Sequence, residues 1–157
     1  MKSDAWKKRM AWALCAAWMG LIFLMSAMPG DVSGEQSGTV TRLLIHSVTL
    51  LLGEETAQAM PSQALELLVR KAAHMAEYAV LWLLFERALR LSGARRPRLW
   101  ALMLSAAYAG TDEFHQRFIP GRGPSPMDVM IDTAGAALAC CFHALWHQRG
   151  RPHDSTV

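Results

Sequence analysis

Cysteine is scarce in this 157-residue chain, and so are the local motifs that announce a soluble enzyme. Cys15, Cys140 and Cys141 all lie in apolar stretches, where a thiol behaves as a small hydrophobe, so they make no disulfide framework. The sequence contains no serine-nucleophile motif and no Gly-rich phosphate loop. Nothing local therefore favours a serine hydrolase or a nucleotide-binding enzyme.

Signatures of nucleic-acid binding are also missing. The chain has a formal net charge of +3 and a pI near 9.0, but it has no zinc knuckle and no basic stripe interleaved with aromatics. We therefore expect no nucleic-acid partner. There is no internal repeat and no low-complexity run, so residues 1–157 are expected to form a single domain.

Charge is absent between Arg9 and Asp31. The uncharged run Met10–Met28 is long enough to cross a bilayer, because about 20 helical residues span the roughly 30 Å hydrocarbon core. A secretory signal peptide is the competing interpretation, since basic residues precede the run. The run exceeds the usual h-region, and Ser26-Ala27-Met28 is a poor cleavage site, so an uncleaved anchor is favoured.

Three further apolar segments follow, within Ala72–Phe85, Leu99–Gly110 and Met127–Trp146. The sequence predicts an all-α integral membrane bundle of four transmembrane helices, at about residues 10–28, 70–90, 98–115 and 126–147. Between the first two lies Gly38–Leu52, whose pattern predicts an amphipathic surface helix rather than another span.

The distribution of basic residues predicts the orientation. With the N-terminus in the cytoplasm, the loops on that side hold eleven Lys and Arg residues and the loops on the other side hold five. We therefore expect a multi-pass protein of the cytoplasmic (inner) membrane with both termini inside.

The second apolar segment carries polar residues on one face. Lys71, His74, Glu77 and Tyr78 recur at three- and four-residue spacing. A central acid in a membrane helix costs about 3 kcal/mol, so such groups normally face the bundle interior and are paired. Two simpler interpretations remain open: Glu77 forms a structural ion pair with Lys71 or Arg122, and His74 is an ordinary interior histidine.

The third and fourth segments bring further polar residues to the same outer end. Tyr108, Asp112, His115 and Gln116 share one side if the third helix continues past Gly110, and Arg117 is spaced to pair with Glu113. In the fourth segment, Ser125 and Asp128 have capping-box spacing, which gives Asp128 a local structural role. Asp132 has no such role, and Gly135 with Ala139 continues its face as a small-residue packing surface.

These residues resemble a known family. The segments "RKAAHMAEYAVLWLL" at 70–84 and "TDEFHQRFIPGRGPSPMDVMIDTAGAALA" at 111–139 are similar to the VanZ-like family of bacterial membrane proteins, as is the Ser-x-x-Pro loop in "SAMPGDVSGEQSG" at 26–38. The matching positions are Lys71, His74, Glu77 and Tyr78; Asp112, Glu113, Gln116, Pro120, Gly121 and Arg122; and Asp128, Asp132 and Gly135. Where the family often continues the last helix with a second Gly, this chain has Ala139 and two cysteines.

The resemblance implies a cell-envelope protein, and the family's namesake is associated with lowered susceptibility to the glycopeptide teicoplanin. With the spacing arguments, it defines a candidate binding or functional cluster. Its members are Lys71, His74, Glu77, Tyr78, Asp112, Glu113, His115, Gln116, Arg122, Asp128 and Asp132.

The sequence is compatible with three functions. The first is a non-catalytic factor whose outward-facing site binds a lipid-linked cell-wall precursor or another anionic headgroup. The second is a membrane hydrolase or transferase acting on a lipid phosphate, with a divalent metal as a possible cofactor. The third is an ion-coupled carrier, which four helices without an inverted repeat support least. His143 and His147 have the spacing of a metal pair, but interfacial anchoring beside Trp146 explains them better.

Overall fold

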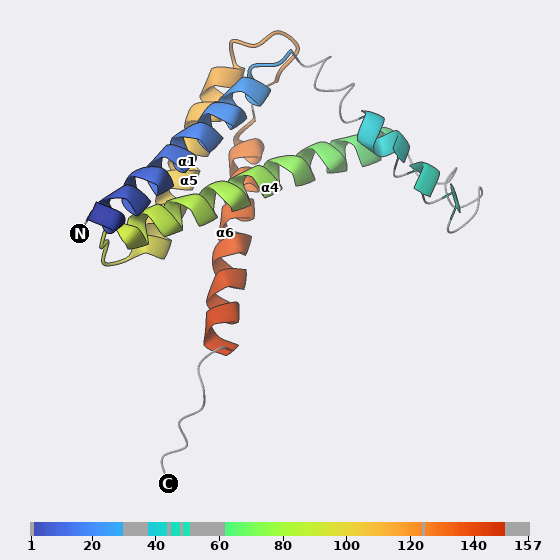
Figure 1. Cartoon of the computed structure of the whole chain (residues 1–157). Coiled ribbons are helices and arrows are strands. Elements are labelled where there is room, and N and C mark those ends of the chain that lie inside the picture. Colours follow the sequence, from blue (N-terminus) through green and yellow to red (C-terminus); the bar gives the residue numbers. More distant parts are fainter. Residues whose placement is uncertain are drawn as a thin grey trace.

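The computed structural model describes residues 2–29, 38–43, 45–47, 49–50, 62–123 and 125–149. Its four long helices are α1 (Lys2–Ser26), α4 (Ser62–Leu91), α5 (Pro97–Gln116) and α6 (Pro126–Arg149) (Figure 1). No strand occurs among these residues. The predicted all-α class is confirmed.

Between the first two long helices, residues 27–29 are not helical, whereas residues 38–43, 45–47 and 49–50 are. Residues 44, 48, 51 and 52 of the predicted amphipathic helix lie outside the described residues. The second long helix begins earlier than the apolar run alone indicates, at Ser62, because the good helix formers of "SQALELLVR" extend it before Lys71.

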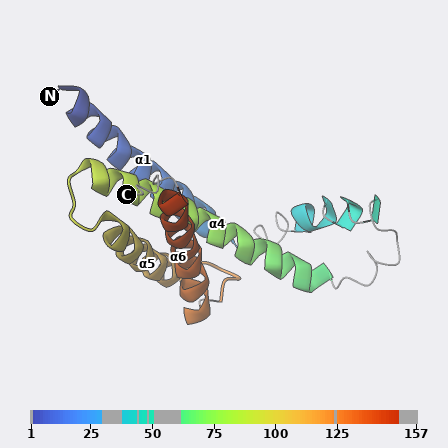
Figure 2. The ribbon, with the colours of Figure 1, turned by 90° about the horizontal axis from the view of Figure 1, so that it is seen from below.

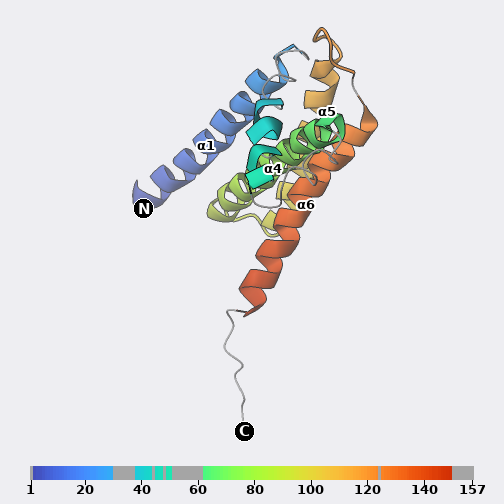
Figure 3. The same cartoon turned by 90° about the vertical axis from the view of Figure 1, so that its right-hand side faces the viewer.

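Helix α4 is the centre of the arrangement and packs against each of the other three long helices. Seen from below, it lies between α1 and α5 (Figure 2), and in the side view α1 and α6 lie on opposite sides of it (Figure 3). The ends of α1 and α5 lie at the top of Figure 1, and α6 starts below them and runs down the picture. This upper end of the bundle carries the polar residues singled out above, so α4 presents their partners to both α5 and α6.

Many large apolar side chains point outward, and the interior holds alanines and polar groups beside the large buried side chains Tyr78, Leu81 and Trp82. Leu24, Met130 and Phe142 are 64%, 65% and 70% exposed, whereas Ala88, Ala101, Ala109 and Ala136 are fully buried. Among the described residues Asp112, Glu113 and Asp132 are buried as well. An apolar exterior this extensive around a partly polar interior is what a lipid solvent favours.

The number of membrane spans is confirmed only in part. Within the described residues, two helical stretches are long and apolar enough to cross a membrane, Asp4–Ser26 and Pro126–His147. Helix α4 fails this test because charged groups, among them Lys71, Glu77 and Glu86, interrupt its apolar run, and the last turns of α5 are polar. A bundle of four spans is therefore not established by length and composition.

Indole and phenol donors fix the helices against one another. The Trp18 indole N–H donates to the Glu77 carbonyl oxygen at 3.0 Å, and the Trp82 indole N–H donates to the Arg98 carbonyl oxygen at 3.3 Å. The Tyr108 hydroxyl donates to the Met19 carbonyl oxygen at 2.6 Å. Buried Trp and Tyr generally find such partners, and here the bonds hold α4 and α5 in register with their neighbours.

Candidate functional site

A small cavity lies between α4, α5 and α6 at the polar end of the bundle. Its volume of about 10 Å³ is roughly the space that one water molecule occupies. We call it the polar cavity, and it is lined by Lys71, His74, Glu113, Gln116, Asp128 and Asp132. Six of the eleven predicted site residues therefore meet around one point.

An ion pair between α4 and α6 forms one wall of the polar cavity. Lys71 donates to the Asp128 carboxylate, and about a quarter of each side chain is exposed. The capping-box interpretation of Asp128 is therefore wrong. The Ser125 hydroxyl does cap α6 by accepting from the Met127 N–H at 3.2 Å, but the Ser125 N–H donates to Glu113 Oε1 at 2.5 Å instead of to Asp128.

His74 lies between two carboxylates. Its Nδ1 is 3.7 Å from Glu77 Oε2 and 3.9 Å from Asp132 Oδ1. These separations are longer than a good hydrogen bond, and Nδ1 is buried without a hydrogen-bond partner. The proposed structural pair of Glu77 with Lys71 or Arg122 does not form, because Lys71 binds Asp128 and Arg122 binds elsewhere.

The acids of α5 are buried and incompletely satisfied. Gln116 donates to Asp112 Oδ2 at 3.2 Å, whereas Asp112 Oδ1 has no hydrogen-bond partner. Glu113 is 6% exposed, and its Oε2 likewise has none. A buried carboxylate oxygen without a donor is costly, so both positions are places where a donor group would stabilise the site.

Arg122 ties the loop after α5 to the end of α1. Its guanidinium donates to the carbonyl oxygens of Met28 at 3.2 Å and Met25 at 3.3 Å, and to Gln116 Oε1 at 3.5 Å. Burial lowers the pKa of Arg122 from its ordinary value, but guanidinium groups remain cationic in proteins. The loop arginine is thus a structural clamp that also reaches the site through Gln116.

We expect Arg122→Lys to destabilise the protein nearly as much as Arg122→Gln, by about 2 kcal/mol, because an ammonium cannot reproduce a planar fork of donors. Thermal unfolding of the detergent-solubilised protein measures the effect. Arg117→Lys is the matched control, since Arg117 is exposed and lies over the Phe114 ring, 5.9 Å from its centre. Equal melting temperatures for Arg122→Lys and wild type would contradict the clamp.

Two of the predicted site residues lie away from the polar cavity. Tyr78 is fully buried, and its ring packs 6.3 Å from the Tyr108 ring. His115 stacks on Phe23 of α1 at 4.4 Å between ring centres. Both residues therefore contribute to helix packing in this structure.

Sequence reasoning also missed contributors. Ser26, at the end of α1, is buried beside Asp112. The only signal for it was its place in the Ser-x-x-Pro loop. The backbone carbonyl oxygens that Arg122 binds carry no sequence signal at all.

A second, more open pocket adjoins the polar cavity, and we call it the outer pocket. It has a volume of about 440 Å³ and lies between the end of α5 and the start of α6. Glu113 lines both spaces, so its side chain forms their common wall. The rest of the lining mixes polar and apolar groups: Gly110, Phe114, Arg117, Ser125, Pro126 and Val129.

The structure thus brings together polar residues from three helices: Lys71 and His74 of α4, Glu113 of α5, and Asp128 and Asp132 of α6. The VanZ/LLP1 family model matches residues 11–147, which is most of the chain. The chain belongs to the VanZ/LLP1 family. No curated protein and no solved structure matches it. Membership and the two apolar helices together make it a membrane protein.

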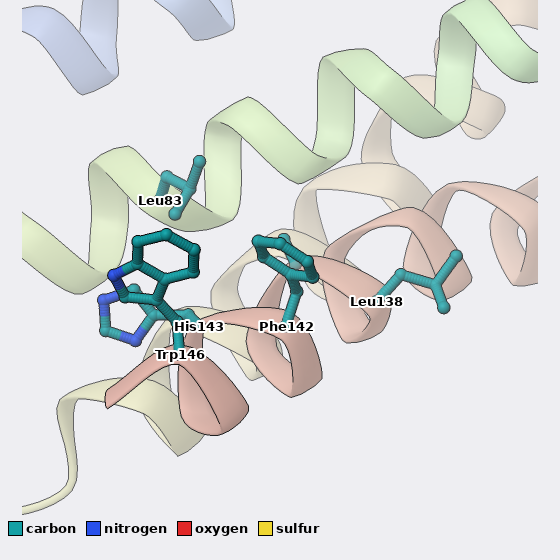
Figure 4. A pocket seen from close by; sticks show the side chains of 6 residues that line it. Leu83, Leu138, Phe142, His143 and Trp146 are labelled. Atoms are coloured by element: carbon teal, nitrogen blue, oxygen red, sulfur yellow. The ribbon is translucent and has the colours of Figure 1, made fainter. Parts of the chain in front are cut away.

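A roomier pocket of this VanZ/LLP1 protein lies apart from the polar chemistry. It has a volume of about 590 Å³, and Figure 4 shows Leu83 of α4 opposite Leu138, Phe142 and Trp146 of α6. His143 lies at the same groove, 4.4 Å from the His147 ring and edge-on to Trp82 at 5.6 Å. Because its lining is almost wholly apolar, we place the candidate functional site at the polar cavity instead.

Within the stretches that the structure describes, no three His, Cys, Asp or Glu side chains are arranged to hold a metal ion. The unpaired groups at the polar cavity instead offer acceptors, on Glu113 and Asp112, and the His74 imidazole between Glu77 and Asp132.

Proposed function

We propose that this chain is a four-span protein of the bacterial inner membrane with both termini in the cytoplasm. The basic residues support this orientation, since eleven would lie inside and five outside. The positions of the helix ends also support this orientation. The segments that would face the cytoplasm lie away from the polar end, toward the lower part of Figure 1: the start of α1, the α4–α5 connection and the end of α6. Helices α4 and α5 would then cross with their charged side chains turned inward.

We expect single-cysteine labelling to report this topology. In a background with the three native cysteines replaced, Gly123→Cys should react with a membrane-impermeant maleimide applied to intact cells, because residue 123 would face outward. Arg95→Cys, in the α4–α5 connection, should react only after the membrane is opened. Labelling of both positions from the same side would contradict four spans.

We further propose that the polar end binds the phosphate-bearing headgroup of an envelope lipid, such as a lipid-linked cell-wall precursor. The observation that carries this proposal is the outer pocket, which is large enough for a small ligand and joins an exposed arginine to buried acids through Glu113. Arg117 supplies a cation for the phosphate, and exposed Phe114, Phe118 and Met127 flank the site with apolar surface for acyl chains.

Direct binding tests the headgroup proposal. Purified protein in detergent should bind short-chain phospholipids more tightly than a diacylglycerol of the same chain length, which has no phosphate. Arg117→Gln should weaken phospholipid binding about tenfold, because the variant loses one charge-assisted hydrogen bond to the phosphate. Arg87→Gln, an exposed arginine of α4 outside both pockets, is the matched control and should bind as wild type does. Equal affinity for the two lipid classes would contradict the proposal.

The same site supports a proposed influence on glycopeptide susceptibility, through an envelope lipid that the protein holds. Asp132→Asn should insert at the wild-type level, because the amide has nearly the same shape, yet it should abolish any reduction in teicoplanin susceptibility that the wild type confers. Asp132 is buried beside His74, and the amide removes its charge. Growth inhibition at graded drug concentrations, with protein levels matched, measures the effect, and full activity in Asp132→Asn would contradict the role of this carboxylate.

The second candidate is a membrane hydrolase or transferase acting on such a lipid phosphate, with a divalent metal as a possible cofactor. One observation favours it: His74 between Glu77 and Asp132 is an arrangement that can accept and return a proton. Turnover of a lipid phosphate by the wild type, lost in Glu77→Gln while lipid binding persists, would support the enzyme over the binding protein.

A further inference from the structure

We propose that the headgroup bound at this site carries a primary ammonium group beside its phosphate, and that Glu113 receives the ammonium. This inference rests on the proposed function and adds the chemical class of its ligand. It follows from the charged groups that line the polar cavity and the outer pocket, and not from the shapes of these pockets alone.

The polar cavity has more negative than positive groups. Its lining holds the carboxylates of Glu113, Asp128 and Asp132 and the ammonium of Lys71. Lys71 and Asp128 neutralise each other in their ion pair. Glu113 and Asp132 are then left with Gln116 and His74 as their polar neighbours in the lining, so a further positive group would be stabilised there.

Glu113 is the side chain best placed to receive that group. Only 6% of Glu113 is exposed. Its Oε1 accepts a hydrogen bond from the Ser125 N–H, whereas its Oε2 is buried without a hydrogen-bond partner. The Ser125 bond fixes the orientation of the carboxylate. Because Glu113 lines both spaces, a ligand in the outer pocket lies against its side chain.

The outer pocket offers the complementary charge. Arg117 lines it from the exposed side, and the remaining walls include the apolar Phe114, Pro126 and Val129. Arg117 at the rim would bind the phosphate of a zwitterionic headgroup, and the Glu113 carboxylate at the base of the pocket would bind its ammonium. An anionic glycerol headgroup offers Glu113 hydroxyl donors but no cation, and a quaternary ammonium has no N–H to donate.

The test compares three short-chain lipids that differ only in headgroup: phosphatidylethanolamine, phosphatidylcholine and phosphatidylglycerol. The detergent-solubilised wild type should bind the ethanolamine lipid about tenfold more tightly than either of the others. Glu113→Gln should remove this preference by weakening ethanolamine-lipid binding to the level of the glycerol lipid. Glu66→Gln, the same change on α4 outside both pockets, is the matched control and should keep the preference.

The possible results separate the two proposals. If all three lipids bind equally to the wild type, the ammonium inference is wrong while headgroup binding stands. If none binds better than diacylglycerol, the proposed function itself is wrong. If Glu113→Gln retains the preference, Glu113 is not the acceptor. The wild-type comparison decides the inference even where Glu113→Gln fails to fold.

Discussion

Gly135→Ala is expected to lower the stability of the protein by about 1–3 kcal/mol or more, the usual cost of overpacking a tight interface. Gly135 lies where α6 crosses α4, and an added Cβ would come within 2.7 Å of the Met75 Cα and 2.8 Å of its carbonyl carbon. These are backbone atoms, so no side-chain rotation relieves the overlap and the helices must separate.

The change should also disturb the site, because α6 carries Asp132 one turn and Asp128 two turns before Gly135. Separation of the helices would move both carboxylates away from Lys71 and His74 on α4. We therefore expect lower headgroup affinity together with the lower melting temperature, both measured on the detergent-solubilised protein.

Gly20→Ala provides the matched control. Gly20 is also within a helix, but a Cβ there would meet nothing within 4 Å. Alanine favours helix over glycine by about 1 kcal/mol, so this variant should be as stable as the wild type or slightly more so. A Gly135→Ala protein as stable as Gly20→Ala would contradict the close crossing of α4 and α6.

Interactions within one helix were predictable from the sequence. The three- and four-residue spacing of Lys71, His74 and Glu77 placed them on one face of α4, and the structure has His74 beside Glu77. The small-residue surface that begins at Gly135 does pack against α4. Each of these inferences depends only on helical periodicity, which the sequence contains directly.

Partners on different helices were harder to predict. The capping-box spacing predicts a local partner for Asp128, yet Asp128 binds Lys71, because the crossing of α4 and α6 brings the two together across 57 residues of sequence. Arg117 has the spacing to pair with Glu113, but it lies over Phe114 while Glu113 accepts from the Ser125 N–H. Crossing angles decide such contacts, and they result from packing along whole helices rather than from any short pattern.

The hydropathy signal of α4 and α5 is weak for a related reason. Helices α4 and α5 carry the polar residues of the site, so composition alone does not mark them as membrane segments. The charged residues that line the polar cavity lower the mean hydropathy of the helices that carry them. In the proposed four-span bundle, their cost in lipid is offset only because neighbouring helices supply partners.

Removing either partner of the Lys71–Asp128 pair is expected to destabilise the protein by about 2 kcal/mol. The value lies between the 0.2–1 kcal/mol of exposed pairs and the 3–5 kcal/mol for breaking a fully buried pair, since about a quarter of each side chain is exposed. Lys71→Met leaves Asp128 without its cation, and Asp128→Leu leaves Lys71 without its anion. The double variant should cost less than the sum of the two single changes, because it removes both charges together.

The exposed pair between Asp4 and Lys7 of α1 is the control for this cycle. Its atoms are 3.8 Å apart and its side chains are 80% and 61% exposed, so its coupling energy should be close to zero. Unfolding free energies for both sets of variants give the two coupling energies. A Lys71–Asp128 coupling no larger than that of Asp4–Lys7 would show that the pair does not hold α4 to α6.

Exchanging the charges, with Lys71→Asp and Asp128→Lys in one chain, should restore only part of the lost stability. Asp128 lies in the first turn of α6, where the helix dipole favours a carboxylate and disfavours a cation. The exchanged pair recovers the attraction between the helices but loses this interaction, and it alters the lining of the polar cavity. Partial recovery of the melting temperature without recovery of headgroup binding would therefore separate the structural role of the ion pair from its role in the site.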